Sequence, residues 1–134
     1  MKYFLALLFV VFVTKVSGQT ATDNYFVSDI SQIDEINITA SMLNTLAKEY
    51  GQTTNFTQLK VQKVSDHYVL LAKDDAQKWI YAFELKSIDS KLYIDVNKHI
   101  NACESETLSI GIFTLNDDGI VGCMKYDHHV LGRN

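Results

Sequence analysis

The chain contains few side chains whose type and spacing could perform chemistry. Two pairs of adjacent carboxylates, Asp74-Asp75 and Asp117-Asp118, could act as a general acid and base if burial raised one of the two pKa values. Both pairs stand in predicted turns, where aspartate is favoured because its side chain accepts hydrogen bonds from the nearby backbone. We therefore interpret both pairs as turn residues.

A histidine pair near the C-terminus is the second candidate. His128 and His129 follow Asp127, and imidazole is a common metal ligand. Neighbouring residues on a strand point to opposite faces, so two ligands for one ion would require a loop here. A solvated C-terminal tail is the simpler interpretation. The sequence has no G-x-S-x-G, H-E-x-x-H or C-x-x-C motif. We expect no catalytic residue, no metal, no cofactor and no enzymatic activity.

Two cysteines, Cys103 and Cys123, remain. A catalytic thiol requires a neighbouring base, and a zinc site requires about four ligands at short spacings. Neither pattern surrounds either cysteine. In an oxidising compartment, a cysteine pair in a small domain usually forms a disulfide. The sequence favours a disulfide between them, with two free thiols as the alternative.

The first eighteen residues have the pattern of a secretory signal peptide. A lysine at the second position precedes the unbroken apolar run Tyr3–Val13, and Val16 and Gly18 stand at the positions that a signal peptidase recognises. The run is about half of the ~20 apolar residues needed to cross a bilayer, which disfavours the alternative of a membrane anchor. We expect cleavage before Gln19 and one secreted, extracytoplasmic domain over 19–134.

The charge pattern excludes some partners. The formal charge of the chain is −4, and cleavage would remove two lysines and lower the charge to −6. The remaining basic residues are scattered, whereas phosphate backbones are bound through clustered Lys and Arg. We expect no nucleic-acid partner and no membrane contact after signal cleavage. In a eukaryotic secreted protein, the sequons at Asn37 and Asn55 would be glycosylation sites.

One helix is predicted near the start of the domain. From Ser28 to Tyr50 the apolar residues recur at every third or fourth position, which places them on one stripe of a helix. The segment Asn37–Thr39 forms helices poorly, so Ala40 to Tyr50 is the secure part. Gly51 is a candidate end of the helix.

Strands are predicted after the helix. The segments Phe56–Val64 and His67–Lys73 are rich in apolar and β-branched residues, with a turn or a bulge at Ser65-Asp66 between them. The segment Lys78–Ile88 alternates between apolar and polar faces. Asp89-Ser90 reads as a tight turn after it.

The turn at Asp89-Ser90 fixes a register for the hairpin around it. Leu85 then faces Ile94, and Phe83 faces Val96, so the apolar faces of the two strands coincide.

A second hairpin is predicted over Leu108–Leu115 and Ile120–Tyr126, with a turn at Asn116–Gly119, while Asn97–Glu106 reads as a polar loop. The apolar face of such a sheet requires a cover, and the helix stripe is the available one. The sequence therefore predicts an α+β fold, in which one N-terminal helix packs across a curved antiparallel sheet of four to six strands.

The region from Asp29 to Tyr126 resembles the cystatin family. DISQIDEINITASMLNTLAKEY is similar to the N-terminal region and long helix of that family, and FTQLKVQKVSDHYVLLAKDDAQKWIYAFEL is similar to its two central strands. The spacing of Cys103 and Cys123 is similar to that of the C-terminal disulfide of secreted cystatins. The resemblance implies a cystatin-like fold.

The resemblance also implies a function, namely inhibition of papain-like cysteine proteases by a Gln-x-Val-x-Gly loop that enters the active-site cleft. Here Val69 stands in the place of the glutamine and Lys73 in the place of the glycine, and Leu115-Asn116-Asp117 replaces a Pro-Trp pair. By this resemblance, the residues expected to contact a protease are Leu70, Leu71, Ala72, Lys73, Asp74, Asn116, Asp117, Asp118 and Gly119.

An alternative function follows from the aromatic face of one strand. Trp79, Tyr81 and Phe83 alternate along the predicted strand and therefore share one side of the sheet. Such a face is usually core, but it could line a pocket between helix and sheet. A small extracellular carrier of an apolar ligand is therefore the alternative to a protease inhibitor.

Overall fold

The computed structural model describes residues 25–124 and 128–131. The predicted signal peptide and its cleavage site lie outside these residues. The elements in chain order are β1 (Phe26–Asp29), the 3₁₀ helix η1 (Ile30–Gln32), α2 (Ala40–Glu49), β2 (Phe56–Val64), β3 (His67–Asp74), β4 (Trp79–Ile88), β5 (Lys91–Ile94), β6 (Ile100–Glu104), the 3₁₀ helix η2 (Ile110–Ile112), β7 (Phe113–Asn116), β8 (Gly119–Cys123) and β9 (His128–Leu131).

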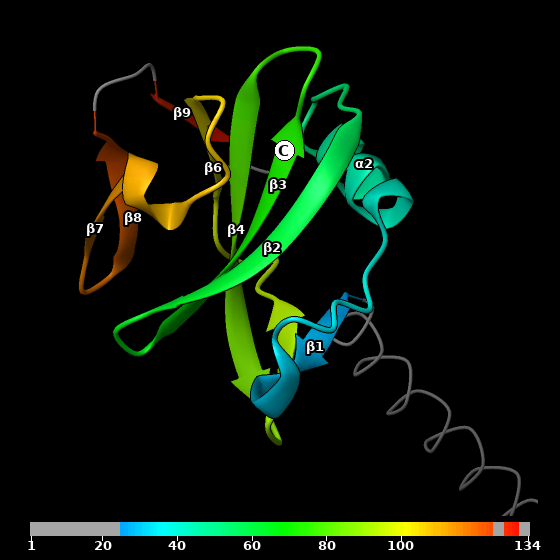
Figure 1. Cartoon of the computed structure of the whole chain (residues 1–134), viewed down its shortest axis with the longest axis vertical. Helices are drawn as coiled ribbons and strands as arrows, with labels where there is room; N and C mark the ends of the chain where they lie inside the picture. The colour runs from blue at the N-terminus through cyan, green and yellow to red at the C-terminus, as the bar shows by residue number, and fades with distance from the viewer. Residues whose placement is uncertain (1–24, 125–127, 132–134) are drawn as a thin grey trace, which may run out of the picture.

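A strongly curved antiparallel sheet is the centre of the fold, and α2 packs against it (Figure 1). Its strand order is β1-β5-β4-β3-β2, and β6 pairs with both β4 and β9. Two strands pair with the same edge of the long strand β4. Its first half, Trp79–Ala82, pairs with β6, and its second half, Leu85–Ile88, pairs with β5. The α+β prediction is confirmed. The seven strands of this sheet exceed the expected four to six, and β7 and β8 add a separate hairpin.

The helix begins where the sequence indicated. The hydroxyl of Thr39 accepts a hydrogen bond from the backbone N–H of Met42 at 3.2 Å and caps the first turn. Gly51 follows the helix with a φ of 81°, a left-handed conformation that favours glycine. The earlier part of the apolar stripe is not helical, because Phe26–Asp29 pair with β5 as strand β1 and Ile30–Gln32 form a single 3₁₀ turn.

The concave face of the sheet is covered by α2. Leu43, Leu46 and Ala47 of the helix are buried in one cluster with Leu70 and Phe83 of the sheet. The helix is also tied to the start of β2 by hydrogen bonds. The side-chain oxygen of Asn44 accepts one from the Thr54 hydroxyl at 2.7 Å and another from the Phe56 N–H at 3.0 Å.

The opposite face of the sheet is covered by the chain from η2 to β8. Val69, Leu71 and Ile80 alternate with the residues that face the helix, and they pack against Phe113 in a second cluster. The carboxamide oxygen of Gln62 accepts a hydrogen bond from the Ile110 N–H at 2.7 Å and anchors η2 to β2. The sheet therefore lies between two covering layers (Figure 1).

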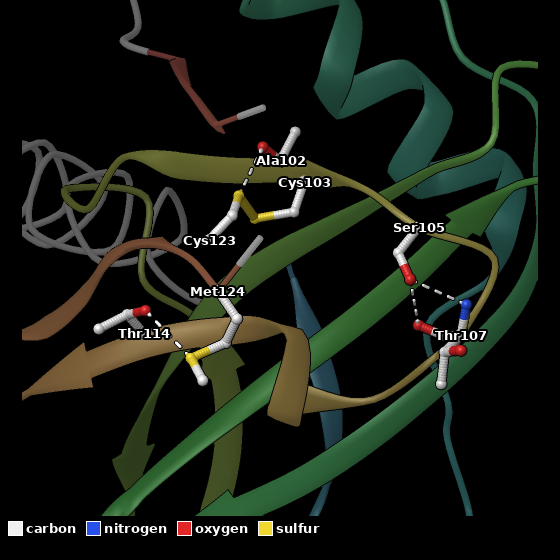
Figure 2. The surroundings of a disulfide bond; sticks show 7 residues. All are labelled: Ala102, Cys103, Ser105, Thr107, Thr114, Cys123 and Met124. Carbon is white, nitrogen blue, oxygen red and sulfur yellow. Dashed lines mark hydrogen bonds between the residues drawn. A yellow bond between two sulfur atoms is a disulfide. The ribbon is translucent and has the colours of Figure 1, made fainter. Parts of the chain in front are cut away.

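The predicted disulfide is present and joins the sheet to the second covering layer. Cys103 of β6 is bonded to Cys123 of β8, with their α-carbons 5.9 Å apart (Figure 2). After β6 the chain turns back, and the hydroxyl of Ser105 accepts a hydrogen bond from the Thr107 N–H at 3.0 Å in this turn. The return of the chain brings together two cysteines that are 20 residues apart.

The hairpin predictions are confirmed in part. Leu85 faces Ile94 as expected, and Asp89 and Ser90 both have positive φ, as a tight two-residue turn requires. Phe83 does not face Val96 in the ladder, because β5 ends at Ile94.

Two other segments differ from the prediction. Asn97–Glu106 is not wholly a loop, since Ile100–Glu104 form β6. In the second hairpin, Ile110–Ile112 are 3₁₀, so its first strand begins only at Phe113.

Candidate functional site

Two hairpin turns lie side by side at one end of the molecule (Figure 1). The first is Ser65-Asp66 between β2 and β3, and the second is Asn116–Gly119 between β7 and β8. A groove of about 490 Å³ separates them and is lined by residues 64–67 and 115–117. We call this pair of turns with its groove the turn pair.

Each turn is stabilised by the backbone conformation or the hydrogen bonds of its own residues. Ser65 has a φ of 53° and completes a two-residue turn between paired residues Val64 and His67. In the other turn, the side-chain oxygen of Asn116 accepts a hydrogen bond from the Asp118 N–H at 2.7 Å. Such local bonds fix a turn before any partner binds.

The rim of the turn pair is acidic. Asp66, Asp117 and Asp118 are all exposed. Glu84 of β4 places a further carboxylate against Gly119 at the end of the second turn. Burial raises the pKa of Glu84, and this effect is opposed by the positive charges of Lys98 and His67.

The expected protease-contact residues divide between strand and turn. Leu70, Leu71 and Ala72 are fully buried within β3, which pairs with a strand on each side. The resemblance placed these three residues in an exposed connection, and that location is wrong because they belong to the centre of the sheet. The connection between β3 and β4 begins only after Asp74.

Lys73 and Asp74 have structural partners. The Lys73 ammonium forms an ion pair with Asp75 at 3.3 Å and donates a hydrogen bond to the carbonyl of Glu106 at 2.8 Å. The Asp74 carboxylate is 1% exposed and accepts hydrogen bonds from the backbone N–H groups of Asn55, Ala76 and Gln77 at 3.0, 3.1 and 3.2 Å. Asp74 therefore organises the β3–β4 turn, as predicted for a turn aspartate.

Of the expected contact residues, only those of the second hairpin belong to the turn pair. Asn116 and Asp117 line its groove, opposite Ser65 and Asp66. Ser65-Asp66 was expected only as a turn or a bulge between two strands, and its place in a site was not predicted. The available signal was its position as a two-residue turn between two long strands.

A second hollow lies on the concave side of the sheet, beside the end of α2. Its volume is about 230 Å³, and its walls are formed by Gln52, Gln77, Trp79, Tyr81, Ala102, His129 and Leu131. We call it the aromatic pocket. No residue of α2 lines it, and Phe83 is buried in the core cluster with the helix. The aromatic strand thus contributes both to the core and to a pocket beside the helix.

His129 contributes to this pocket from β9. Residues 128–131 pair with β6, so the expectation of a solvated tail is wrong at this segment. The ring of His129 packs edge-to-face on Trp79 at a centroid distance of 4.8 Å. Among residues 25–124 and 128–131, no three His, Cys, Asp or Glu side chains are arranged to hold a metal ion.

The two predicted glycosylation sites are on the surface. Asn37 precedes the helix cap and Asn55 precedes β2, and both side chains are exposed. Their modification stays a prediction. Within the described part of the chain, no helix is long and apolar enough to cross a bilayer.

Comparison with known proteins adds no family. No protein-family model matches the chain, and neither the curated proteins nor the solved structures contain a significant match.

Proposed function

We propose that this chain is a secreted, non-catalytic binding protein that inserts the turn pair into the active-site cleft of a papain-type cysteine protease. The observation that supports the proposal is the adjacency of the turns Ser65-Asp66 and Asn116–Gly119 at one end of the fold. The proposal rests on the resemblance to cystatins for the class of partner. It relies on the leader sequence for secretion.

The turn pair has the physical properties of a binding edge. Each turn closes a paired hairpin and contains a two-residue tip, so little conformational entropy is lost when a partner binds. The second hairpin is fixed to the sheet by the Cys103–Cys123 disulfide. Two rigid tips separated by a groove match a cleft better than they match a flat surface.

The proposal is tested by inhibition of papain with the purified protein. We expect inhibition by the wild-type chain and a loss of at least tenfold in potency for Asp66→Arg and for Asp117→Arg, because each places a bulky side chain at a tip. Asp34→Arg, an equal charge change at an exposed position before α2, is the matched control. Absence of inhibition by the wild-type chain at high concentration would refute the protease as partner. Equal potency of the tip variants and the control would refute the turn pair as the contact.

A further inference from the structure

The geometry points to a small-molecule site in the aromatic pocket. We infer that this pocket binds an uncharged molecule of one or two aromatic rings that carries an N–H or O–H donor, as phenol and indole do. The inference does not depend on the turn pair, because Tyr81 and Ala102 face the concave side of the sheet together with α2. The groove of the turn pair is lined by other residues.

The size of the pocket limits the ligand to one or two rings. Its volume of about 230 Å³ is below the ~300 Å³ at which pockets for larger ligands begin. A cavity of about 150 Å³ is known to hold benzene. A single ring therefore fits with space to spare, and a fused pair of rings fills the pocket.

The wall residues favour an aromatic and uncharged ligand. Trp79, Tyr81 and His129 supply rings, and Ala102 and Leu131 supply apolar contacts. Among the described residues, the walls contain no Asp, Glu, Lys or Arg side chain, so a charged ligand would lose its hydration without gaining an ion pair with these walls. Aromatic pairs in offset or edge-to-face contact contribute beyond simple burial.

Two wall groups are available for a hydrogen bond. The hydroxyl of Tyr81 belongs to a side chain that is 3% exposed, and within the described residues neither this hydroxyl nor the carboxamide of Gln52 forms a hydrogen bond. The N–H group of the Gln77 carboxamide donates to the carbonyl of Thr53 at 3.3 Å, which holds this wall side chain in place. Burial and the negative charge of Asp74 raise the pKa of Tyr81, so its hydroxyl is protonated at neutral pH. Both groups line the pocket and can accept a hydrogen bond from a ligand N–H or O–H in place of one from solvent.

The test uses the indole N–H of Trp79, because the chain contains one tryptophan. In a ¹H–¹⁵N spectrum of the full chain at pH 7.5, titration with unlabelled indole or phenol is expected to shift this signal to saturation. The variant that removes the acceptor of this hydrogen bond, Tyr81→Phe or Gln52→Ala, is expected to weaken binding about fivefold, the usual effect of one hydrogen bond. Tyr93→Phe, which removes a hydroxyl from β5, is the matched control and should bind as the wild type does.

The other outcomes overturn the inference. Failure of both indole and phenol to produce a saturable shift would show that the pocket does not take such rings. A shift with glucose or with dodecanoate, but with neither ring compound, would assign the site to a sugar or to a fatty acid instead. Full affinity in both Tyr81→Phe and Gln52→Ala would remove the proposed hydrogen bond. The amide spectrum of each variant confirms that it is folded.

Discussion

The carboxylate of Glu84 lies directly against Gly119, so that a β-carbon at position 119 would stand 2.8 Å from Glu84 Oε2. Gly119 also has a φ of 128°, a conformation that residues with a side chain rarely adopt. The β7–β8 turn can therefore approach β4 only because position 119 has no side chain. This contact couples the turn pair to the central strand of the sheet.

The first prediction concerns Gly119. We expect Gly119→Ala to lower the free energy of unfolding by about 1–3 kcal/mol, because alanine is strained at this φ and its methyl group displaces the Glu84 carboxylate. Urea denaturation monitored by circular dichroism measures this change. Gly122→Ala in the same hairpin is the control, since a β-carbon there meets no atom within 4 Å. Equal stability of the two variants would contradict the contact.

The second prediction concerns the pH dependence of stability. Burial raises the pKa of Glu84 in the folded state, and the nearby charge of Asp95 adds to this effect. The folded protein then holds the proton more tightly than the unfolded chain does. The contribution of Glu84 to the free energy of unfolding therefore falls as the pH rises from the unfolded pKa to the folded pKa, and it stays lower above that range.

Glu84→Gln removes this titratable group. The free energy of unfolding should therefore fall less with rising pH in this variant, and the variant should be more stable than the wild type at pH 7. Thermal unfolding between pH 4 and pH 7 measures both effects. Glu35→Gln, at an exposed position before α2, should keep the decline of the wild type. A decline of unchanged size in Glu84→Gln would assign the pH dependence to another group.

The third prediction concerns Asp74. Asp74→Ala should cost about 2–3 kcal/mol of stability, because two backbone N–H groups in the β3–β4 turn and that of Asn55 before β2 lose their acceptor. Asp74→Asn should also destabilise, since an amide retains one acceptor oxygen where the carboxylate uses both. Asp75→Ala is the comparison and should cost clearly less, because the Asp75 side chain is 51% exposed. Chemical denaturation of the three variants decides the order.

The fourth prediction concerns the disulfide. Replacement of Cys103 and Cys123 by alanine should lower stability by about 3 kcal/mol, the value for a closed loop of this length. Hydrogen exchange should accelerate mainly in residues 113–123, because these are attached to the sheet through β8, while the amides of α2 keep their protection. Unchanged exchange in residues 113–123 would show that the apolar contacts of Phe113 hold the hairpin alone.

The sequence was informative where local pattern and tertiary structure agree. The helix at Ala40–Glu49 follows from the periodicity of its apolar residues. The facing pair Leu85 and Ile94 follows from the short turn between their strands. The cysteine pair follows from composition alone.

The missed strands lack such a pattern. In β6, Ile100, Asn101, Ala102 and Cys103 are all 3% exposed or less, so both faces are buried and the apolar and polar residues do not alternate. The strand is specified by its neighbours β4 and β9, which are distant in sequence. The order of apolar and polar residues within one β-strand contains no information about such partners.

The two candidate sites illustrate the same limit. Asp66 and Asn116 line the groove of the turn pair, and Gln52 and His129 line the aromatic pocket, although each two residues are far apart in the sequence. Each segment has an ordinary local explanation as a turn, a loop or a strand. Their meeting depends on the curvature of the sheet and on the return of the chain after β6, which residue spacing does not encode.

The covalent loop closed by Cys103 and Cys123 also determines how the protein would respond to digestion. Glu106 and Thr107 are exposed within that loop, in the kind of segment that proteases cut first. A chain cleaved there would keep its full mass and migrate as one species in non-reducing electrophoresis. Two fragments would separate only after a reductant is added, so an intact band without reductant is no proof of an uncut polypeptide.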